Sequence, residues 1–198
     1  LPNVVIPIVN FQFNFVLDET FSSEEGLLSF LSYFRGAQYI IALFLSLFVG
    51  RIYGRFGLPV SLMFHPFNYL IAFGAYFLQF NIFSAAYAGI SVGVLRTAIN
   101  NPAISTLYGL LLPKDRAILR PFLRGTVIRV GILFGSALLW FGNMVMHPRY
   151  LSLAAAVFVL GWIGGTLLLK REYSKILLDL VRGELPDFSK LEPGDVKD

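Results

Sequence analysis

The sequence contains no cysteine and few charged side chains, and it has two histidines, His65 and His147. Disulfide frameworks, thiolate nucleophiles and cysteine-based metal centres are therefore excluded, and two isolated histidines indicate no metal site. Charged residues make up 14% of the chain, against roughly 25% in an ordinary soluble domain. No Ser/His/Asp group, carboxylate pair or phosphate-binding glycine loop is visible, so we expect neither an enzyme nor a bound cofactor.

Apolar residues dominate the composition, with 56% hydrophobic residues and a mean hydropathy of +0.69. A soluble chain of 198 residues has too little interior to hide so much apolar surface, so lipid must cover the rest. The net charge of +4 does not indicate nucleic acid, because the basic residues lie at segment ends and inside apolar runs. The composition predicts an all-α membrane domain in contact with a lipid bilayer.

Six segments are apolar enough for membrane helices, which need about 20 residues each. They are residues 1–17, 28–49, 59–78, 85–112, 121–146 and 150–169. We therefore expect a six-helix transmembrane bundle over residues 1–169. Residues 170–182 have the pattern of a cytoplasmic amphipathic helix, and residues 184–198 that of a linker to a soluble regulatory domain.

Basic residues predict the orientation in the membrane, because short cytoplasmic loops carry the excess of Lys and Arg. The loops at 50–58 and 111–124 are basic, whereas the loop at 18–25 on the opposite side is acidic. Both termini should be cytoplasmic, in a bacterial inner membrane. The chain opens at Leu1 inside an apolar run with no initiator Met, so we expect it to belong to a longer protein.

Three asparagines in the first segment, Asn3, Asn10 and Asn14, lie within about 40° of one another on a helix, with Pro7 on the same side. A polar stripe on a membrane helix must face protein or water. Two interpretations are open: hydrogen bonding to other helices, or lining a substrate path.

Arg96 lies in the middle of one of the most apolar stretches of the chain. A guanidinium near the bilayer centre costs several kcal/mol, by estimates from ~3 to more than ~10, and is tolerated where it faces water or an anion. Arg96 shares a helix face with Asn100, and Asn101 and Pro102 should loosen the helix. We expect Arg96 and Asn100 to bind a negatively charged substrate; the alternative is that Arg96 caps carbonyls of a kinked neighbour.

Arg124 and Arg129 in the fifth segment are expected to add positive potential to the same site, although Arg35, Arg124 and Arg129 could instead extend to the membrane surface. No acidic residue lies inside any segment, which favours exchange or uniport over proton symport. Three GxxxG pairs predict close helix packing. They are Gly89 with Gly93, Gly131 with Gly135, and Gly161 with Gly165.

The segment Gly50-Arg51-Ile52-Tyr53-Gly54-Arg55-Phe56-Gly57 resembles the loop signature of the major facilitator superfamily. It keeps the glycines and both basic positions, and has Tyr53 or Gly54 where the superfamily has an aspartate. The resemblance implies a gating loop formed by Gly50, Arg51, Gly54, Arg55 and Gly57. It also implies that the six helices are half of a twelve-helix carrier whose N-terminal half is missing here. A His-Pro pair followed by Tyr-Leu, at His65 and at His147, is consistent with inverted three-helix repeats.

Residues 101–115 and 124–131 are similar to the ATP/ADP translocase family, a divergent branch of that superfamily. The similarity implies a nucleotide as the anionic small-molecule substrate and exchange as the mode of transport. The leading prediction is a carrier domain that moves an organic anion by alternating access. The alternative is a transporter-derived membrane sensor or scaffold that acts on a soluble cytoplasmic domain.

Overall fold

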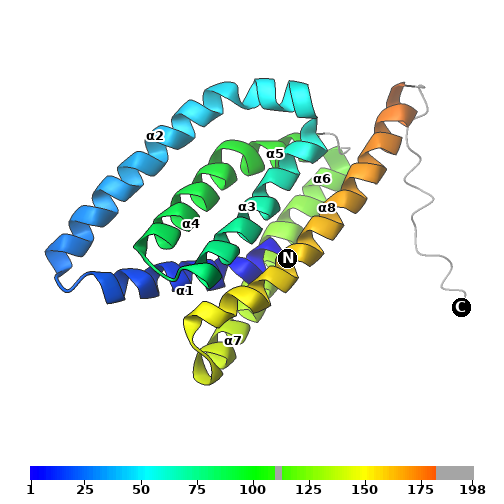
Figure 1. The fold of residues 1–198 in the computed structure, drawn as a ribbon. Coiled ribbons are helices and arrows are strands. Elements are labelled where there is room, and N and C mark those ends of the chain that lie inside the picture. Colours follow the sequence, from blue (N-terminus) through cyan, green and yellow to red (C-terminus); the bar gives the residue numbers. More distant parts are fainter. Residues whose placement is uncertain (110–112, 182–198) are drawn as a thin grey trace, which may run out of the picture.

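The computed structural model describes residues 1–109 and 113–181, and these residues are helical apart from short connections (Figure 1). The first three helices are α1 (Pro2–Thr20), α2 (Glu24–Phe56) and α3 (Leu58–Leu78). α4 (Ile82–Leu95) continues through a π-helical turn, η1 (Arg96–Asn100), into α5 (Asn101–Gly109). α6 (Pro113–Phe122) continues through a second π-helical turn, η2 (Leu123–Val127), into α7 (Ile128–Val145). A 3-10 turn, η3 (Pro148–Tyr150), leads into α8 (Leu151–Val181).

Five helical segments are long and apolar enough to cross a membrane. They are Glu24–Phe56, Leu58–Leu78, Ile82–Gly109, Arg116–Val145 and Pro148–Arg171. The expectation of an all-helical fold is confirmed for the described residues, and the five segments are compatible with a membrane protein. α1 is not among the five, because its amide and acidic side chains lower its mean hydropathy. A sixth span and the inverted three-helix repeats therefore stay predictions.

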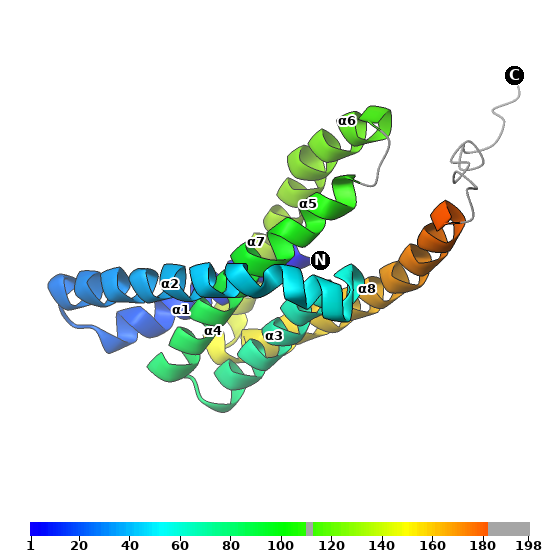
Figure 2. The ribbon, with the colours of Figure 1, turned by 90° about the horizontal axis from the view of Figure 1, so that it is seen from above.

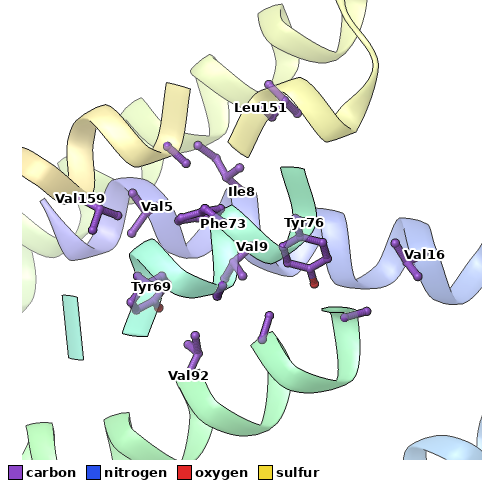
Figure 3. Close-up of a cluster of buried hydrophobic side chains, with 14 residues drawn as sticks. Val5, Ile8, Val9, Val16, Tyr69, Phe73, Tyr76, Val92, Leu151 and Val159 are labelled. Atoms are coloured by element: carbon purple, nitrogen blue, oxygen red, sulfur yellow. The ribbon is translucent and has the colours of Figure 1, made fainter. Parts of the chain in front are cut away.

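The core forms where α1, α3, α4 and α8 meet (Figure 3). α1 contacts α7, α4 and α8, and its buried face carries Val5, Ile8 and Val9. Tyr69, Phe73 and Tyr76 of α3 fill the space between α1 and α8 on one side and α4 on the other. Burial of these side chains provides the main apolar contact between the first and second halves of the chain.

The outer helices contribute little to this core. α2 buries only Ala42 and α7 only Gly135. In Figure 2, the ends of α5 and α6 point away from the end of α8, so the helices splay apart on that side of the molecule. Large apolar side chains are exposed along α2 and α7, among them Tyr39, Phe44 and Phe134. These surfaces suit contact with lipid chains or with other membrane helices.

Polar contacts link the middle of α1, the end of α3 and the start of α8. Arg149 donates hydrogen bonds from Nε to the carbonyl of Phe77, at 2.5 Å, and from Nη2 to that of Leu78, at 3.0 Å. These carbonyls belong to the last turn of α3, where no intrahelical donor is available. The buried Gln12 of α1 donates through Nε2 to the carbonyl of Pro148, at 2.7 Å, and to Oγ of Ser152, at 2.8 Å.

Two predicted boundaries are wrong. The expected loop at 50–58 is mostly helical, because α2 extends through Phe56 and only Gly57 adopts a positive φ of 79°. The expected loop at 111–124 contains α6, so Pro121 lies inside a helix rather than at its start. Residues 170–181 are helical, as the continuation of α8, and the expected cytoplasmic position of this amphipathic helix stays a prediction. Residues 110–112 and the predicted linker 184–198 lie outside the described residues.

The predicted close packing is confirmed for two of the three glycine pairs. A Cβ on Gly131 would lie 3.0 Å from Cβ of Asn3, and a Cβ on Gly135 would overlap the backbone of Val4. Likewise, a Cβ on Gly89 or Gly93 would overlap side chains of α1 and α2. The pair in α8 is different. A Cβ on Gly161 would meet Leu1 at 3.8 Å, and one on Gly165 would meet nothing within 4 Å.

Candidate functional site

A cavity of about 270 Å³ lies between α1, α2 and α4, with contributions from α3 and η1. Its apolar wall includes Val9, Phe13, Phe34 and Val92. Six side chains with polar groups also line it: Asn10, Asn14, Arg35, Gln38, Tyr69 and Arg96. A concave site with an apolar wall and a few polar groups is the usual form of a small-molecule site.

The charge of this cavity is positive. Arg35 from α2 and Arg96 from η1 both line it, and no Asp or Glu among the described residues does. Asp18 lines a neighbouring depression, which Asn14 also lines. Two guanidinium groups with no carboxylate between them attract an anion and can bind carboxylate or phosphate oxygens in pairs.

α1 brings two of its three predicted asparagines to the cavity. Asn10 and Asn14 are exposed and line it. Asn3 does not line it, because it lies against Gly131 of α7, where the missing side chain of glycine makes room. Of the two interpretations of the polar stripe, lining a cavity fits Asn10 and Asn14, whereas helix packing fits Asn3.

Arg96 is the first residue of the π-helical turn η1, and its carbonyl accepts a hydrogen bond from the N–H of Asn101, five residues later. Pro102 follows, and a proline lacks the N–H that a regular α-helix requires and clashes with a carbonyl of the preceding turn. The predicted loosening of this helix is confirmed, and it takes the form of a π-helical turn. Such turns occur frequently at functional sites. Asn100 is half-buried and does not line the cavity, so its role in substrate binding stays a prediction.

Gln38 positions α2 against α4 beside the cavity. Its Nε2 donates a hydrogen bond to the carbonyl of Gly89, at 3.0 Å, and its side chain occupies the space over Gly93. The sequence analysis missed Gln38, and it did not place Arg35 in the site. The two residues are three apart on a helix and therefore share a face, which is the signal that could have identified them together.

The signature segment contacts the π-helical turn rather than the cavity. Tyr53, near the position where the superfamily has an aspartate, donates a hydrogen bond from its hydroxyl to the carbonyl of Ile99, at 2.6 Å. Arg51 and Arg55 lie over the rings of Phe48 and Phe56, at 5.7 and 5.8 Å from the ring centroids. Five residues of the segment were expected to form the gate, namely Gly50, Arg51, Gly54, Arg55 and Gly57. None of them lines the cavity, and their gating role stays a prediction.

Arg124 and Arg129 are exposed on η2 and α7 and do not line the cavity. α7 packs on the side of α1 that carries Asn3 and Val4, and the contribution of Arg124 and Arg129 to substrate binding stays a prediction. Extension of their side chains to a membrane surface was the other interpretation.

Comparisons of the chain with protein-family models, with curated proteins and with solved structures found no match. The likeness to the major facilitator superfamily consequently remains a resemblance of short motifs.

Proposed function

We propose that this chain is a membrane carrier domain that binds an organic anion in the cavity between α1, α2 and α4. The observation that supports this proposal is that Arg35 and Arg96 line one cavity from two different helices, with no acidic side chain among its lining residues. Guanidinium groups inside membrane segments are costly unless they face water, an anion or a polar partner. A site that gathers two of them is well suited to a negatively charged substrate.

The proposed roles follow from the chemistry of the side chains. Arg35 and Arg96 would bind the charged oxygens of the anion, since each guanidinium can donate two parallel hydrogen bonds. Asn10 and Asn14 would bind hydroxyl or carbonyl groups, because an amide both donates and accepts. Gln38 is already engaged with Gly89 and would hold the α2 wall in place.

The volume of the cavity limits the substrate. About 270 Å³ is at the lower end of the roughly 300–1,000 Å³ that ligand sites occupy. It suits a small carboxylate or phosphate, or the phosphate end of a nucleotide whose remainder lies against another helical bundle. In the second case the substrate would be an adenine nucleotide, and movement would follow from rocking of this bundle against a partner half.

A transport assay in proteoliposomes tests this proposal. The assay would measure uptake of labelled ATP, ADP, inorganic phosphate and dicarboxylates into vesicles that contain the purified protein or its Arg35→Gln, Arg96→Gln or Arg129→Gln variant. We expect uptake of one class of anion, lost in Arg35→Gln and Arg96→Gln and kept in the matched control Arg129→Gln. Equal uptake by all four proteins, or by none above empty vesicles, would contradict a carrier role.

The sensor or scaffold alternative is favoured by one observation, the unbroken course of α8 from Leu151 beside the core to Val181. A continuous helix can transmit a movement at the core to its far end. Binding without transport would support this alternative. It would appear as an anion-induced rise in melting temperature that depends on Arg96, with no uptake into proteoliposomes.

A further inference from the structure

A histidine lies inside the bundle, one helical turn from the cavity. His65 of α3 is 2% exposed, and its Nδ1 has no hydrogen-bond partner in the part of the chain that the structure describes. Its ring packs edge-on against Tyr69, with centroids 5.1 Å apart, and against Trp162 of α8, with centroids 5.4 Å apart. Tyr69 in turn lines the cavity. One ring therefore separates the imidazole from the site that we assign to the anion.

The charged surroundings of His65 are simple. Arg96 belongs to η1, which packs against α3, and it lines the cavity together with Tyr69, whose ring touches His65. Tyr69 is the titratable neighbour on α3 itself, while α8 contributes Trp162, which does not titrate. The sequence has no Asp or Glu between residues 27 and 109. Histidine is the side chain that most readily gains and loses a proton near neutral pH.

We propose that His65 is a proton-binding residue coupled to the anion cavity, so that binding of the anion is accompanied by uptake of a proton. The inference rests on the proposed function of the cavity. It would give the carrier a proton-linked step, as an alternative to the exchange or uniport that the absence of membrane carboxylates favours.

The coupling follows from the sign of the charges. With the cavity empty, an imidazolium at His65 and the guanidinium of Arg96 would repel each other in a site of low dielectric constant. An anion on Arg96 cancels that repulsion, and the neutral imidazole then accepts a proton from water through the lone pair of its unprotonated ring nitrogen. The proton returns to water when the anion leaves. Because linkage is reciprocal, protonation of His65 must strengthen anion binding by the same factor.

Tryptophan fluorescence provides a local readout of this proton. Trp140 and Trp162 are the two tryptophans of the chain, so Trp140→Phe leaves the one that touches His65. An imidazolium in contact with an indole quenches its fluorescence, and a neutral imidazole does so much less. In this background we expect the fluorescence of Trp162 to decrease as the pH is lowered, along a single titration curve. The titration should vanish in His65→Phe, which keeps a ring against Trp162, and should persist in the matched control His147→Gln.

The coupling to Arg96 is tested without any ligand. Arg96→Gln removes the like charge, so the midpoint of the fluorescence titration should rise by about one pH unit. Arg129→Gln, which removes a charge on α7 away from the cavity, should leave the midpoint unchanged. Loss of the titration only in His65→Phe together with a shift only in Arg96→Gln supports the coupling. A titration that survives in His65→Phe, or a midpoint that is equal in Arg96→Gln and the parent, would overturn it.

Addition of anions completes the test. With sulfate, whose charge is constant across the titration, or with ATP, the midpoint of the parent protein should rise, and that of Arg96→Gln should not. If Arg96→Gln shifts the midpoint while neither anion changes the midpoint or the melting temperature, the charge coupling stands, and both anion binding in the cavity and proton uptake with the anion are overturned. If an anion raises the melting temperature but not the midpoint, the anion site stands and proton coupling is overturned.

Discussion

The amide of Gln38 on α2 donates a hydrogen bond to the carbonyl of Gly89 on α4, at 3.0 Å. This bond matters because α2 has one buried residue, Ala42, along its whole length. The contact holds the α2 wall of the cavity at the level of Arg35, three residues before Gln38. A movement of α2 away from α4 that opens the cavity would have to break this bond.

Arg96 should decide the affinity for anions. Arg96→Lys keeps the charge but loses the planar pair of donors, so it should weaken binding less than Arg96→Gln. Loss of a desolvated, charge-assisted contact should cost on the order of 2 to 5 kcal/mol. The measurement is the rise in melting temperature on addition of ATP or inorganic phosphate. Equal rises in the parent and both variants would exclude a substrate role, and unfolding of ligand-free Arg96→Gln would indicate a structural one.

Gly135 should be intolerant of a side chain. A Cβ there would overlap the backbone of Val4, which cannot move aside as a side chain can. Gly135→Ala should therefore lower the free energy of unfolding by about 1–3 kcal/mol. The matched control is Gly165→Ala, whose Cβ would meet nothing within 4 Å, and which should be neutral or up to about 1 kcal/mol stabilising. Thermal unfolding in detergent measures both, and equal effects would contradict the α1–α7 contact.

Gln12 should stabilise the junction of α1 with α8. Gln12→Leu leaves the carbonyl of Pro148 and the hydroxyl of Ser152 without their donor, which should cost about 1 kcal/mol. The exposed Gln79 provides the control, because Gln79→Leu removes an amide that faces outward. The free energies of unfolding of Gln12→Leu and Gln79→Leu, both measured by thermal unfolding, should differ by about 1 kcal/mol. A Gln12→Leu variant as stable as the parent would show that the bonds are replaced by others.

The orientation in the membrane can be read by cysteine labelling, since the parent chain has no cysteine. Single cysteines at Ser23 and Asn81 should react with an impermeant reagent added to intact cells, and one at Lys114 should not. This pattern follows from the basic residues around Lys114 and the acidic loop near Ser23. Protection of Ser23→Cys and Asn81→Cys together with labelling of Lys114→Cys would reverse the predicted topology.

Much of the fold could be predicted from composition and periodicity. Apolar segments identify membrane helices because lipid demands both length and hydropathy, and the centres of the predicted segments lie in helices. Their ends were less predictable. Gly50 and Gly54 suggested a loop, yet nothing packs within 4 Å of either position and α2 continues through both. Glycine is tolerated in membrane helices because backbone hydrogen bonds cannot be exchanged for water there.

The site was predicted in part, and for a clear reason. Arg96, Asn10 and Asn14 were identified because a polar side chain in an apolar segment needs a wet or polar environment. Arg124 and Arg129 satisfy the same rule but lie on a helix that packs elsewhere. The sequence shows that a polar side chain in an apolar segment needs a polar environment, but it does not show which helix will lie beside that side chain. Gln38 and His65 could be identified only from the tertiary contacts of α2 with α4 and of α3 with α8.

The π-helical turn at Arg96–Asn100 also determines which residues follow it on each side of the helix. A π-helical turn contains one residue more than a regular α-helical turn, so every later side chain is rotated by about 100° from the position that an uninterrupted α-helix would give it. Ala103 thereby lies fully buried against Leu58 and Leu62 of α3, whereas Ile104 is exposed. In a regular helix a different side chain would occupy that narrow place. Deletion of one residue within 97–100 should consequently restore a regular α-helical turn and leave Ala103 at this contact, whereas a regular helix of unchanged length would bring Pro102 there.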